Sequence, residues 1–367
     1  MNYQGRIDAA RALMAEKGFD VLLISHPANR AYLSGFANDD PAASSSAAWI
    51  ALTPNEGYFV TSFLYYEAVA NSMRHLEPVR AQRRPLEGLI ELLEKVPGSS
   101  IGFEGTWVNY SVYQKLVEAL DGEHALKPAD GLIEQLRQIK DDEELKIMRQ
   151  AIALTDRVYS TVVAQLRSGQ TEREVAWELE RALREGGADG MAFGPVVAAG
   201  AHAAVPHHEP TDHQLREGEP VWIDMGARLG GYCADLTRSF CLGSASPEYL
   251  DAYNLVLRAQ EKALATIKDG VSGKEADAVA RDVIEDAGRG EEFGHSLGHG
   301  VGLNIHEAPS LARTSEDTLH SGMVVTVEPG VYRAGWGGVR IEDVVLVERD
   351  GVEILSSAAK QPIVGLA

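Results

Sequence analysis

The stretch VWIDMGARLGGYCADLTRSF, residues 221–240, has the pattern of a β-hairpin that contains two aspartates. Apolar residues flank a glycine-containing turn on both sides, which predicts two antiparallel strands joined by a tight connection. Asp224 and Asp235 are equidistant from a turn placed at Leu229–Gly230, so we expect them to be cross-strand neighbours. Two carboxylates that face each other on a partly buried sheet repel, and one takes up a proton unless a cation lies between them.

A shifted register is the alternative for this hairpin, because it would leave both aspartates in solvent. A shift by one residue would also turn Trp222 and Ile223 to the opposite face of the sheet, since side chains alternate between the two faces of a strand. The hairpin alone does not distinguish the two registers, so the choice depends on whether other segments supply further residues for a metal site.

A second acidic hairpin is predicted in MVVTVEPGVYRAGWGGVRIEDVVLVE, residues 323–348. Glu328 follows a run of valines, Glu342 follows Val339-Arg340-Ile341, and the two glutamates are symmetric about Gly335. Acidic residues are disfavoured inside strands rich in β-branched residues. Four such carboxylates in two hairpins are therefore harder to explain as edge residues than one would be.

The histidines lie between the hairpins, in FGHSLGHGVGLNIHEAPS, residues 293–310. His295, His299 and His306 stand among glycines, which allow a backbone to approach another group closely. A lone histidine here would more often be structural, but three beside two acidic hairpins favour a site. Four carboxylates and one imidazole suit Mn²⁺, Co²⁺ or Zn²⁺ and balance the charge of two such ions.

The composition limits the kind of protein. A length of 367 residues is enough for two domains, and 45% hydrophobic with 24% charged residues is typical of a soluble globular protein. The net charge of −20 argues against a nucleic-acid surface and against an anionic membrane. Residues 1–25 lack the apolar stretch of a signal peptide, and no run has the length of a membrane span. We expect a cytoplasmic protein that binds neither nucleic acid nor membranes.

Two domains are expected, with a boundary near residue 135. Residues 1–134 alternate helical and strand patterns without a reactive cluster, whereas glycine-rich turns and histidines concentrate in residues 135–367. A long amphipathic helix is predicted to begin at Asp141 or Asp142, and Thr171 with Glu174 indicates a capping box for the next helix. The predicted fold class is therefore mixed α/β (α+β).

With these motifs, the chain resembles the pita-bread metallopeptidases, the group that contains aminopeptidase P, prolidase and methionine aminopeptidase. The family's metal-binding motifs are matched by DMGARLGGYCADLTRSF, HSLGHGVGLNIHE, VEPGVY and VRIED, and AAVPHHEP supplies a histidine of the proline-specific members. The resemblance implies a C-terminal pita-bread catalytic domain behind a smaller, creatinase-like α/β N-terminal domain. The complete ligand set argues against the creatinase branch, and the N-terminal domain argues against a methionine aminopeptidase.

The resemblance also implies roles for ten residues and a dinuclear centre. It gives the metal ligands as Asp224, Asp235, His299, Glu328 and Glu342, with Glu328 also the general base, His207 and His306 as catalytic hydrogen-bond donors, and His295, Tyr332 and Arg340 as substrate-side or supporting residues. A hydroxide that bridges the two ions would attack the carbonyl of an Xaa-Pro peptide bond. Manganese is favoured over cobalt or zinc, and a homodimer is expected.

The choice between an aminopeptidase and a dipeptidase rests on one position. A dipeptidase must bind the free carboxylate of proline, and prolidases of similar size often have an arginine directly after the HE-x-P segment. Here Ser310 occupies that place, although Arg313 is near enough in sequence to substitute. We therefore expect an Xaa-Pro aminopeptidase, with an Xaa-Pro dipeptidase (prolidase) as the alternative.

Two hypotheses of other classes compete with the metallopeptidase. GHSLG, residues 294–298, fits the nucleophile elbow of a serine hydrolase at Ser296, but that motif needs a strand before it and a helix after it. The segment EDAGRGEEFG before it is no strand, and the glycines after it make a poor helix. The other competitor is a non-catalytic binding module, in which the full set of ligands would have no use.

Overall fold

The computed structural model describes residues 1–37, 40, 42–120 and 124–365. The chain forms two compact units, Met1–Arg137 and Gln138–Ala367. Both contain helices and sheets, so the predicted mixed fold class is confirmed. Within the described ranges, the helices are too short or too polar to cross a membrane.

The first unit is built on a six-stranded sheet in the order β4-β3-β2-β1-β5-β6. Its elements are α1 (Tyr3–Glu16), β1 (Val21–Ile24), α2 (Pro27–Ser34), η1 (Ala43–Ser45), β2 (Ala48–Leu52), β3 (Gly57–Thr61), α3 (Phe63–Ser72), β4 (Glu77–Arg80), α4 (Pro85–Leu93), β5 (Ser100–Phe103), α5 (Tyr110–Ala119), β6 (Ala125–Pro128) and α6 (Leu132–Gln138). The fully apolar β1 is buried along its length, as expected for a central strand. β2 and β3 form an antiparallel hairpin, while β5 and β6 run parallel to β1.

The second unit begins with two helices whose starts were predicted. Asp141 caps α7 (Asp142–Val163) and Thr171 caps α8 (Glu172–Glu185), and both helices have reciprocal capping boxes, with Glu144 and Glu174 as the partners. These caps satisfy backbone donors that a helix leaves unpaired at its first turn.

The remaining elements alternate short strands with a second pair of helices. They are β7 (Gly190–Met191), β8 (Val196–Ala199), η2 (Gly200–Ala204), β9 (Pro220–Met225), β10 (Ala227–Leu229), β11 (Tyr232–Cys233), β12 (Leu236–Leu242), α9 (Pro247–Thr266), α10 (Gly273–Asp286), η3 (Gly290–Glu292), β13 (Gly298–Gly300), β14 (Glu307–Leu311), β15 (Val324–Val327), β16 (Gly330–Arg333), β17 (Gly337–Arg340), β18 (Asp343–Val347), β19 (Val352–Ile354) and β20 (Ile363–Val364). The main sheets have the orders β20-β12-β9-β8 and β14-β13-β15-β18-β19.

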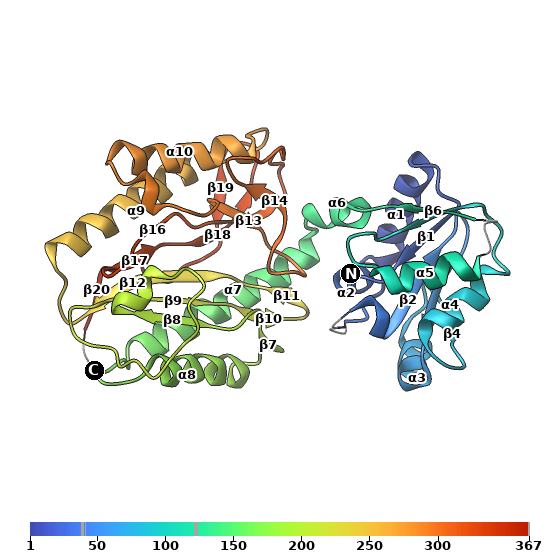
Figure 1. The fold of residues 1–367 in the computed structure, drawn as a ribbon, viewed down its shortest axis with the longest axis horizontal. Coiled ribbons are helices and arrows are strands. Elements are labelled where there is room, and N and C mark those ends of the chain that lie inside the picture. Colours follow the sequence, from blue (N-terminus) through green and yellow to red (C-terminus); the bar gives the residue numbers. More distant parts are fainter. Residues whose placement is uncertain (38–39, 41, 121–123, 366–367) are drawn as a thin grey trace. The chain divides into compact units, whose positions relative to one another are not determined.

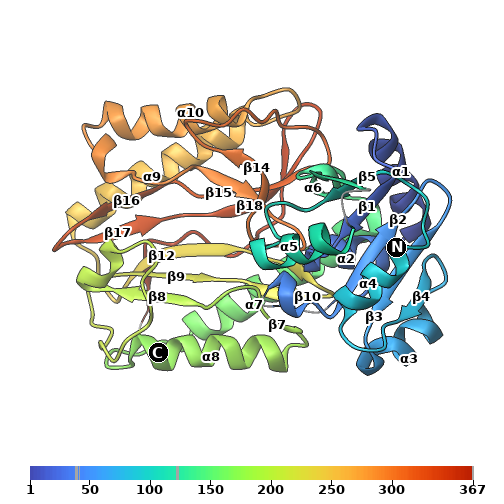
Figure 2. The ribbon, with the colours of Figure 1, turned by 45° about the vertical axis from the view of Figure 1, so that its right-hand side comes forward.

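The two main sheets of this unit lie between two helix pairs (Figures 1 and 2). One apolar core packs α7 and α8 against β8, β9 and β12, and includes Leu179 and Ile223. The other packs α9 and α10 against β15 and β18, and includes Val256 and Val325. Each sheet thus packs its apolar side chains against its own helix pair. Polar side chains at the strand ends between the two helix pairs can therefore form a site.

Candidate metal centre

Nine of the ten residues singled out from the sequence line one cavity of about 950 Å³ in the second unit. They are His207, Asp224, Asp235, His295, His299, His306, Glu328, Arg340 and Glu342. The tenth, Tyr332, contacts two of them: its hydroxyl accepts a hydrogen bond from Arg340 Nη1 at 3.0 Å and lies 3.0 Å from His295 Nε2. The structure thus brings all ten together from segments spread over more than a hundred residues.

The proposed ligands lie at or next to strand ends. Asp224 is in β9, Asp235 precedes β12, His299 is in β13, Glu328 follows β15 and Glu342 precedes β18. Strands hold backbone positions firmly, so side chains at their ends are placed with little freedom.

The expected register of the first hairpin was wrong by two residues. Asp224 lies opposite Thr237, not opposite Asp235. The turn is centred on Gly230 and Gly231, which both have positive φ, because a two-residue hairpin turn of this kind needs left-handed backbone at both positions. A shift of two residues keeps every side chain on its face, so both aspartates still reach the cavity.

The second hairpin has the expected register. Val327 pairs with Asp343 on one side of the glutamates, and Gly330 pairs with Arg340 on the other. Glu328 and Glu342 therefore occupy equivalent places between the two paired segments, and Gly335 at the turn has a positive φ.

The carboxylates and His299 are within reach of a common ion. His299 Nε2 lies 3.2 Å from Glu328 Oε1 and 3.7 Å from Asp235 Oδ2. One possible ligand atom from each of Asp235, His299 and Glu342 lies within 4.8 Å of the other two. These separations suit side chains that share one or two cations.

Two threonines support the ligands, and sequence reasoning missed them. Thr237 Oγ1 donates to Glu342 Oε2 at 2.7 Å and accepts from Arg340 Nε at 3.0 Å. Thr326 Oγ1 accepts from the backbone N–H of His299 at 3.0 Å and donates to Glu328 Oε1 at 3.1 Å. Each threonine stands two residues from a ligand on a strand, and side chains two apart share a face. That spacing is the signal by which they could have been found.

Arg340 is the central cation of the site. Its guanidinium is buried above the indole of Trp222 and pairs with Asp224, while its Nε lies 4.0 Å from Glu328 Oε2. An arginine that donates to several acceptors at once fixes the orientation of a carboxylate.

The carboxylates have unequal pKa values. Burial, together with the neighbouring carboxylates, raises the pKa of Asp235 and of Glu342 well above the usual range. Burial also raises the pKa of Asp224, against the opposing charge of Arg340. For Glu328, burial is outweighed by the hydrogen bond and charge of His299, which lower its pKa to about 2. The site therefore concentrates more negative charge than its own side chains neutralise.

The residues fit the divalent ions that the resemblance implies. Among the described side chains, Asp224 Oδ1 is buried without a hydrogen-bond partner, although its other oxygen pairs with Arg340. A buried carboxylate oxygen without a donor is costly, and a cation would satisfy it. Four carboxylates and one imidazole are also donors that hard or borderline divalent ions prefer.

Three further histidines surround the ligands. The ring of His306 packs edge-on against that of His299, with centroids 4.3 Å apart. Burial and then the positive charge of His299 lower the pKa of His306, and His207 contributes in the same direction. Burial likewise lowers the pKa of His295, so both His295 and His306 are neutral hydrogen-bonding groups near pH 7.

The serine-hydrolase hypothesis is not supported by the geometry around Ser296. This serine lies in an irregular segment between η3 and β13, so a strand follows it where the nucleophile elbow requires a helix. Asp317 accepts from the backbone of Ser310 at 2.7 Å, and His320 pairs with Asp269 at 3.3 Å. These two residues therefore have partners of their own and form no triad with Ser296.

Family models match most of the chain. Residues 146–349 match the model described as metallopeptidase family M24, and residues 6–139 match the one described as creatinase/prolidase N-terminal domain. A relative named Xaa-Pro dipeptidase from Pyrococcus furiosus is 33% identical over 356 residues, which cover 97% of this chain and 99% of that protein. An uncharacterized peptidase of Bacillus subtilis is 34% identical over 359 residues, or 98% of this chain and 99% of that one.

Solved structures agree over the same length. The Xaa-Pro dipeptidase from Bacillus anthracis has a TM-score of 0.93 at 36% identity, covering 99% of both chains. The X-Pro aminopeptidase from Thermotoga maritima has a TM-score of 0.87 at 34% identity, covering 97% of this chain and 100% of that one. Both kinds of proline-directed exopeptidase thus share this architecture.

Proposed function

This chain belongs to metallopeptidase family M24, and from that premise we propose that it is a dinuclear Xaa-Pro dipeptidase. The observation that carries the proposal is the cavity on which the four carboxylates, His299 and the further histidines His207, His295 and His306 converge. The names of several relatives support the choice of dipeptides as substrates. This reverses the preference for an aminopeptidase drawn from the sequence.

The five ligands would hold two divalent ions. Such ions, when bound, lower the pKa of a water molecule and polarise the carbonyl that it attacks. Glu328 is ionised at neutral pH and serves as general base for the proton of the attacking water. His306 and His207 line the same cavity and hydrogen-bond the substrate carbonyl as negative charge develops on its oxygen.

The cavity also suits a proline ring. A peptide bond before proline has no N–H, so a peptidase cannot recognise it through that donor and has to bind the ring itself. Phe193, Pro195 and Ile305 supply apolar surface in the cavity. We assign the ring of the substrate's proline to this surface.

An Xaa-Pro aminopeptidase is the second candidate, and one observation favours it. Ser310 lines the cavity at the place where an arginine would bind a terminal carboxylate. Arg313, which could have replaced it, is largely exposed and donates to Glu285 at 2.9 Å. The described residues therefore place no arginine at position 310, and the nearby Arg313 pairs with Glu285 instead.

A comparison of Ala-Pro with Ala-Pro-Ala tests the proposal. We expect the full-length, manganese-loaded protein to hydrolyse the dipeptide with a kcat/KM at least about tenfold higher than the tripeptide, a difference of about 1.4 kcal/mol. A preference for the tripeptide would establish the aminopeptidase instead. Failure to cleave either peptide would contradict both and favour a non-catalytic binding module.

The variant Ser310→Arg sharpens the same assay. If Ser310 faces the substrate's carboxyl end, the new guanidinium should increase kcat/KM for Ala-Pro relative to Ala-Pro-Ala. Arg313→Ser is the matched control, since Arg313 pairs with Glu285, and it should leave the ratio unchanged.

Three further expectations remain predictions: manganese as the resident metal, a homodimer and a cytoplasmic location. Metal analysis tests the first, and light scattering tests the second.

A further inference from the structure

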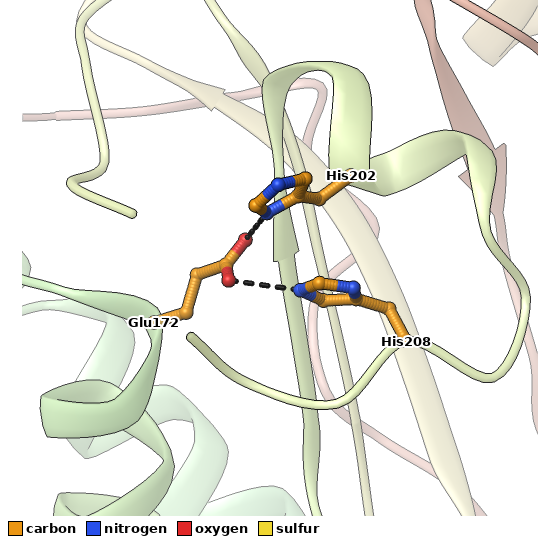
Figure 3. A group of neighbouring side chains, drawn as sticks. All are labelled: Glu172, His202 and His208. Atoms are coloured by element: carbon orange, nitrogen blue, oxygen red, sulfur yellow. Dashed lines mark hydrogen bonds and ion pairs between the residues drawn. The ribbon is translucent and has the colours of Figure 1, made fainter. Parts of the chain in front are cut away.

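A second group of side chains with the donors and spacing to hold a metal ion consists of residues outside the ligand set described above. Glu172 is the first residue of α8, His202 is in η2, and His208 follows η2. Figure 3 shows both imidazoles directed at the same carboxylate. His202 Nδ1 lies 3.0 Å from Glu172 Oε1, and His208 Nε2 lies 2.8 Å from Oε2.

The carboxylate of Glu172 is held in place by other donors. Its side chain is fully buried. Oε1 accepts from the backbone N–H of Ala199 at 2.9 Å, and Oε2 accepts from the backbone N–H and the hydroxyl of Thr211 at 3.0 and 2.7 Å. Burial is outweighed by these bonds and by His208, so the pKa of Glu172 is lowered and the group is ionised at neutral pH. Outer hydrogen bonds of this kind orient the carboxylates that bind metals.

The spacing of the three side chains suits a small divalent ion. Their possible ligand atoms all lie within 4.8 Å of one another. Neighbouring ligands around a tetrahedral zinc ion are about 3.3 Å apart, given bonds of about 2.0–2.1 Å. Separations of 2.8 and 3.0 Å need to widen by only a few tenths of an ångström to admit the ion.

The surroundings supply a route from solvent and a further imidazole. The side chain of His202 is 39% exposed, whereas that of His208 is 11% exposed. The ring centroid of His213 lies 4.9 Å from that of His202. A water molecule or His213 could therefore complete the coordination of an ion reached from the exposed side.

We infer that Glu172, His202 and His208 bind one divalent transition-metal ion, such as zinc, through side chains other than those of the dinuclear centre, although His208 lines the same cavity. Imidazole nitrogens with one carboxylate are donors suited to zinc, copper or nickel, whereas the carboxylate-rich centre favours harder ions. The two sets have no residue in common. His208 directly follows His207, so the ion would tie down the segment that carries a proposed catalytic histidine.

Metal counting on the full chain tests this inference. The protein is stripped with a chelator, reloaded with Zn²⁺, freed of excess metal by gel filtration and analysed for zinc per chain. We expect wild type to retain one more ion per chain than His202→Ala. His320→Ala removes another partly exposed histidine that pairs with a carboxylate, and this matched control should retain the wild-type number. Equal counts for wild type and His202→Ala would overturn the inference.

Anomalous diffraction from zinc-soaked wild-type crystals gives a measurement that depends on no variant. A peak between Glu172 and the two imidazoles would support the site, and its absence while the dinuclear centre is occupied would show that the three residues only hydrogen-bond one another. Asp235→Asn should lower occupancy at the dinuclear centre alone. Loss of the proposed peptidase chemistry and loss of this third site are thus distinguishable.

Discussion

Glu342 and Asp343 are adjacent in the chain, and both are buried, yet their surroundings are opposite. Asp343 is met by Arg238 Nη2 at 2.8 Å, Lys360 Nζ at 2.5 Å and Gln260 Nε2 at 3.0 Å. Glu342 receives a hydrogen bond from Thr237 and faces a cavity that it shares with the three other carboxylates of the proposed ligand set. Successive side chains of a strand point to opposite faces, which is how one dipeptide serves both environments.

The difference separates a structural acid from a functional one. Around Asp343 the positive charges exceed the negative ones, so burial is compensated inside the protein. In the cavity, four carboxylates share Arg340 and His299, and burial, together with the neighbouring carboxylates, raises the pKa values of Asp235 and Glu342. A cluster left with an excess of charge in a cavity indicates that a ligand supplies the balance.

The largest effect on activity is expected from Asp235→Asn, which removes one negative charge from the cavity. Turnover of Ala-Pro should fall by at least about a thousandfold, as when a principal electrostatic contact is lost, while the fold persists because an amide of equal size relieves repulsion. Steady-state kinetics with saturating manganese and circular dichroism provide the measurement. Asp269→Asn, at an exposed carboxylate, is the control and should remain active. Near-normal turnover of Asp235→Asn would remove the basis for the metal assignment.

At the buried pair of Arg238 and Asp343, the variant Arg238→Met should lower the stability of the protein. Because Asp343 would lose a buried guanidinium partner, we expect the free energy of unfolding to fall by about 3–5 kcal/mol in denaturant titrations. The double variant Arg238→Met/Asp343→Asn should recover part of that loss, since no acid remains at the position. A loss below about 1 kcal/mol, the size typical of exposed ion pairs, would show that the pair of Arg238 and Asp343 contributes little to stability.

A pH profile of the chelated protein tests the excess of negative charge in the cavity. The raised pKa values of Asp235 and Glu342 mean that the folded protein binds protons more tightly than the unfolded chain. Their contribution to stability is fully present below the ordinary carboxyl pKa of about 4 and is lost as pH rises through the raised values. Melting temperatures of chelated wild type should therefore fall from mild acid toward neutrality. Glu342→Gln or added manganese should flatten the profile, and an unchanged slope in both would contradict the account.

A smaller effect is expected from Tyr332→Phe. Its hydroxyl joins Arg340 to His295, and burial raises the pKa of Tyr332 to about 12, so it remains a neutral hydrogen-bonding group. Loss of a partner that orients a ligand set should lower kcat/KM about tenfold. Tyr58→Phe removes an exposed hydroxyl bonded to Glu56 and should leave kcat/KM unaltered.

The smallest effect is expected at an exposed ion pair. Arg149 and Glu353 pair on the surface with side chains 43% and 39% exposed. Arg149→Ala should change the free energy of unfolding by no more than about 1 kcal/mol, because solvent screens the pair. A loss as large as that of Arg238→Met would show that exposure does not explain the contrast between the two arginines.

The helix starts and the second hairpin could be predicted because they depend on neighbours in sequence. The capping boxes at Asp141 and Thr171 join residues three apart, and the register about Gly335 follows from symmetry within one short segment. The register of the first hairpin was predicted wrongly, because the turn was placed at Leu229–Gly230, whereas the strands pair about Gly230–Gly231.

Residue types and local patterns were enough to predict the donor chemistry, because they show which carboxylates and imidazoles stand in apolar or glycine-rich segments and hence that cations are expected. Which of these side chains meet, that Arg340 pairs with Asp224, and that Arg313 pairs with Glu285 became known only from the three-dimensional arrangement. It also showed that Glu172, apparently an ordinary acid of a first helical turn, meets His202 thirty residues later. Local patterns record backbone preference and burial, whereas such meetings join segments that are distant in the sequence and depend on how the elements pack, which no short segment encodes.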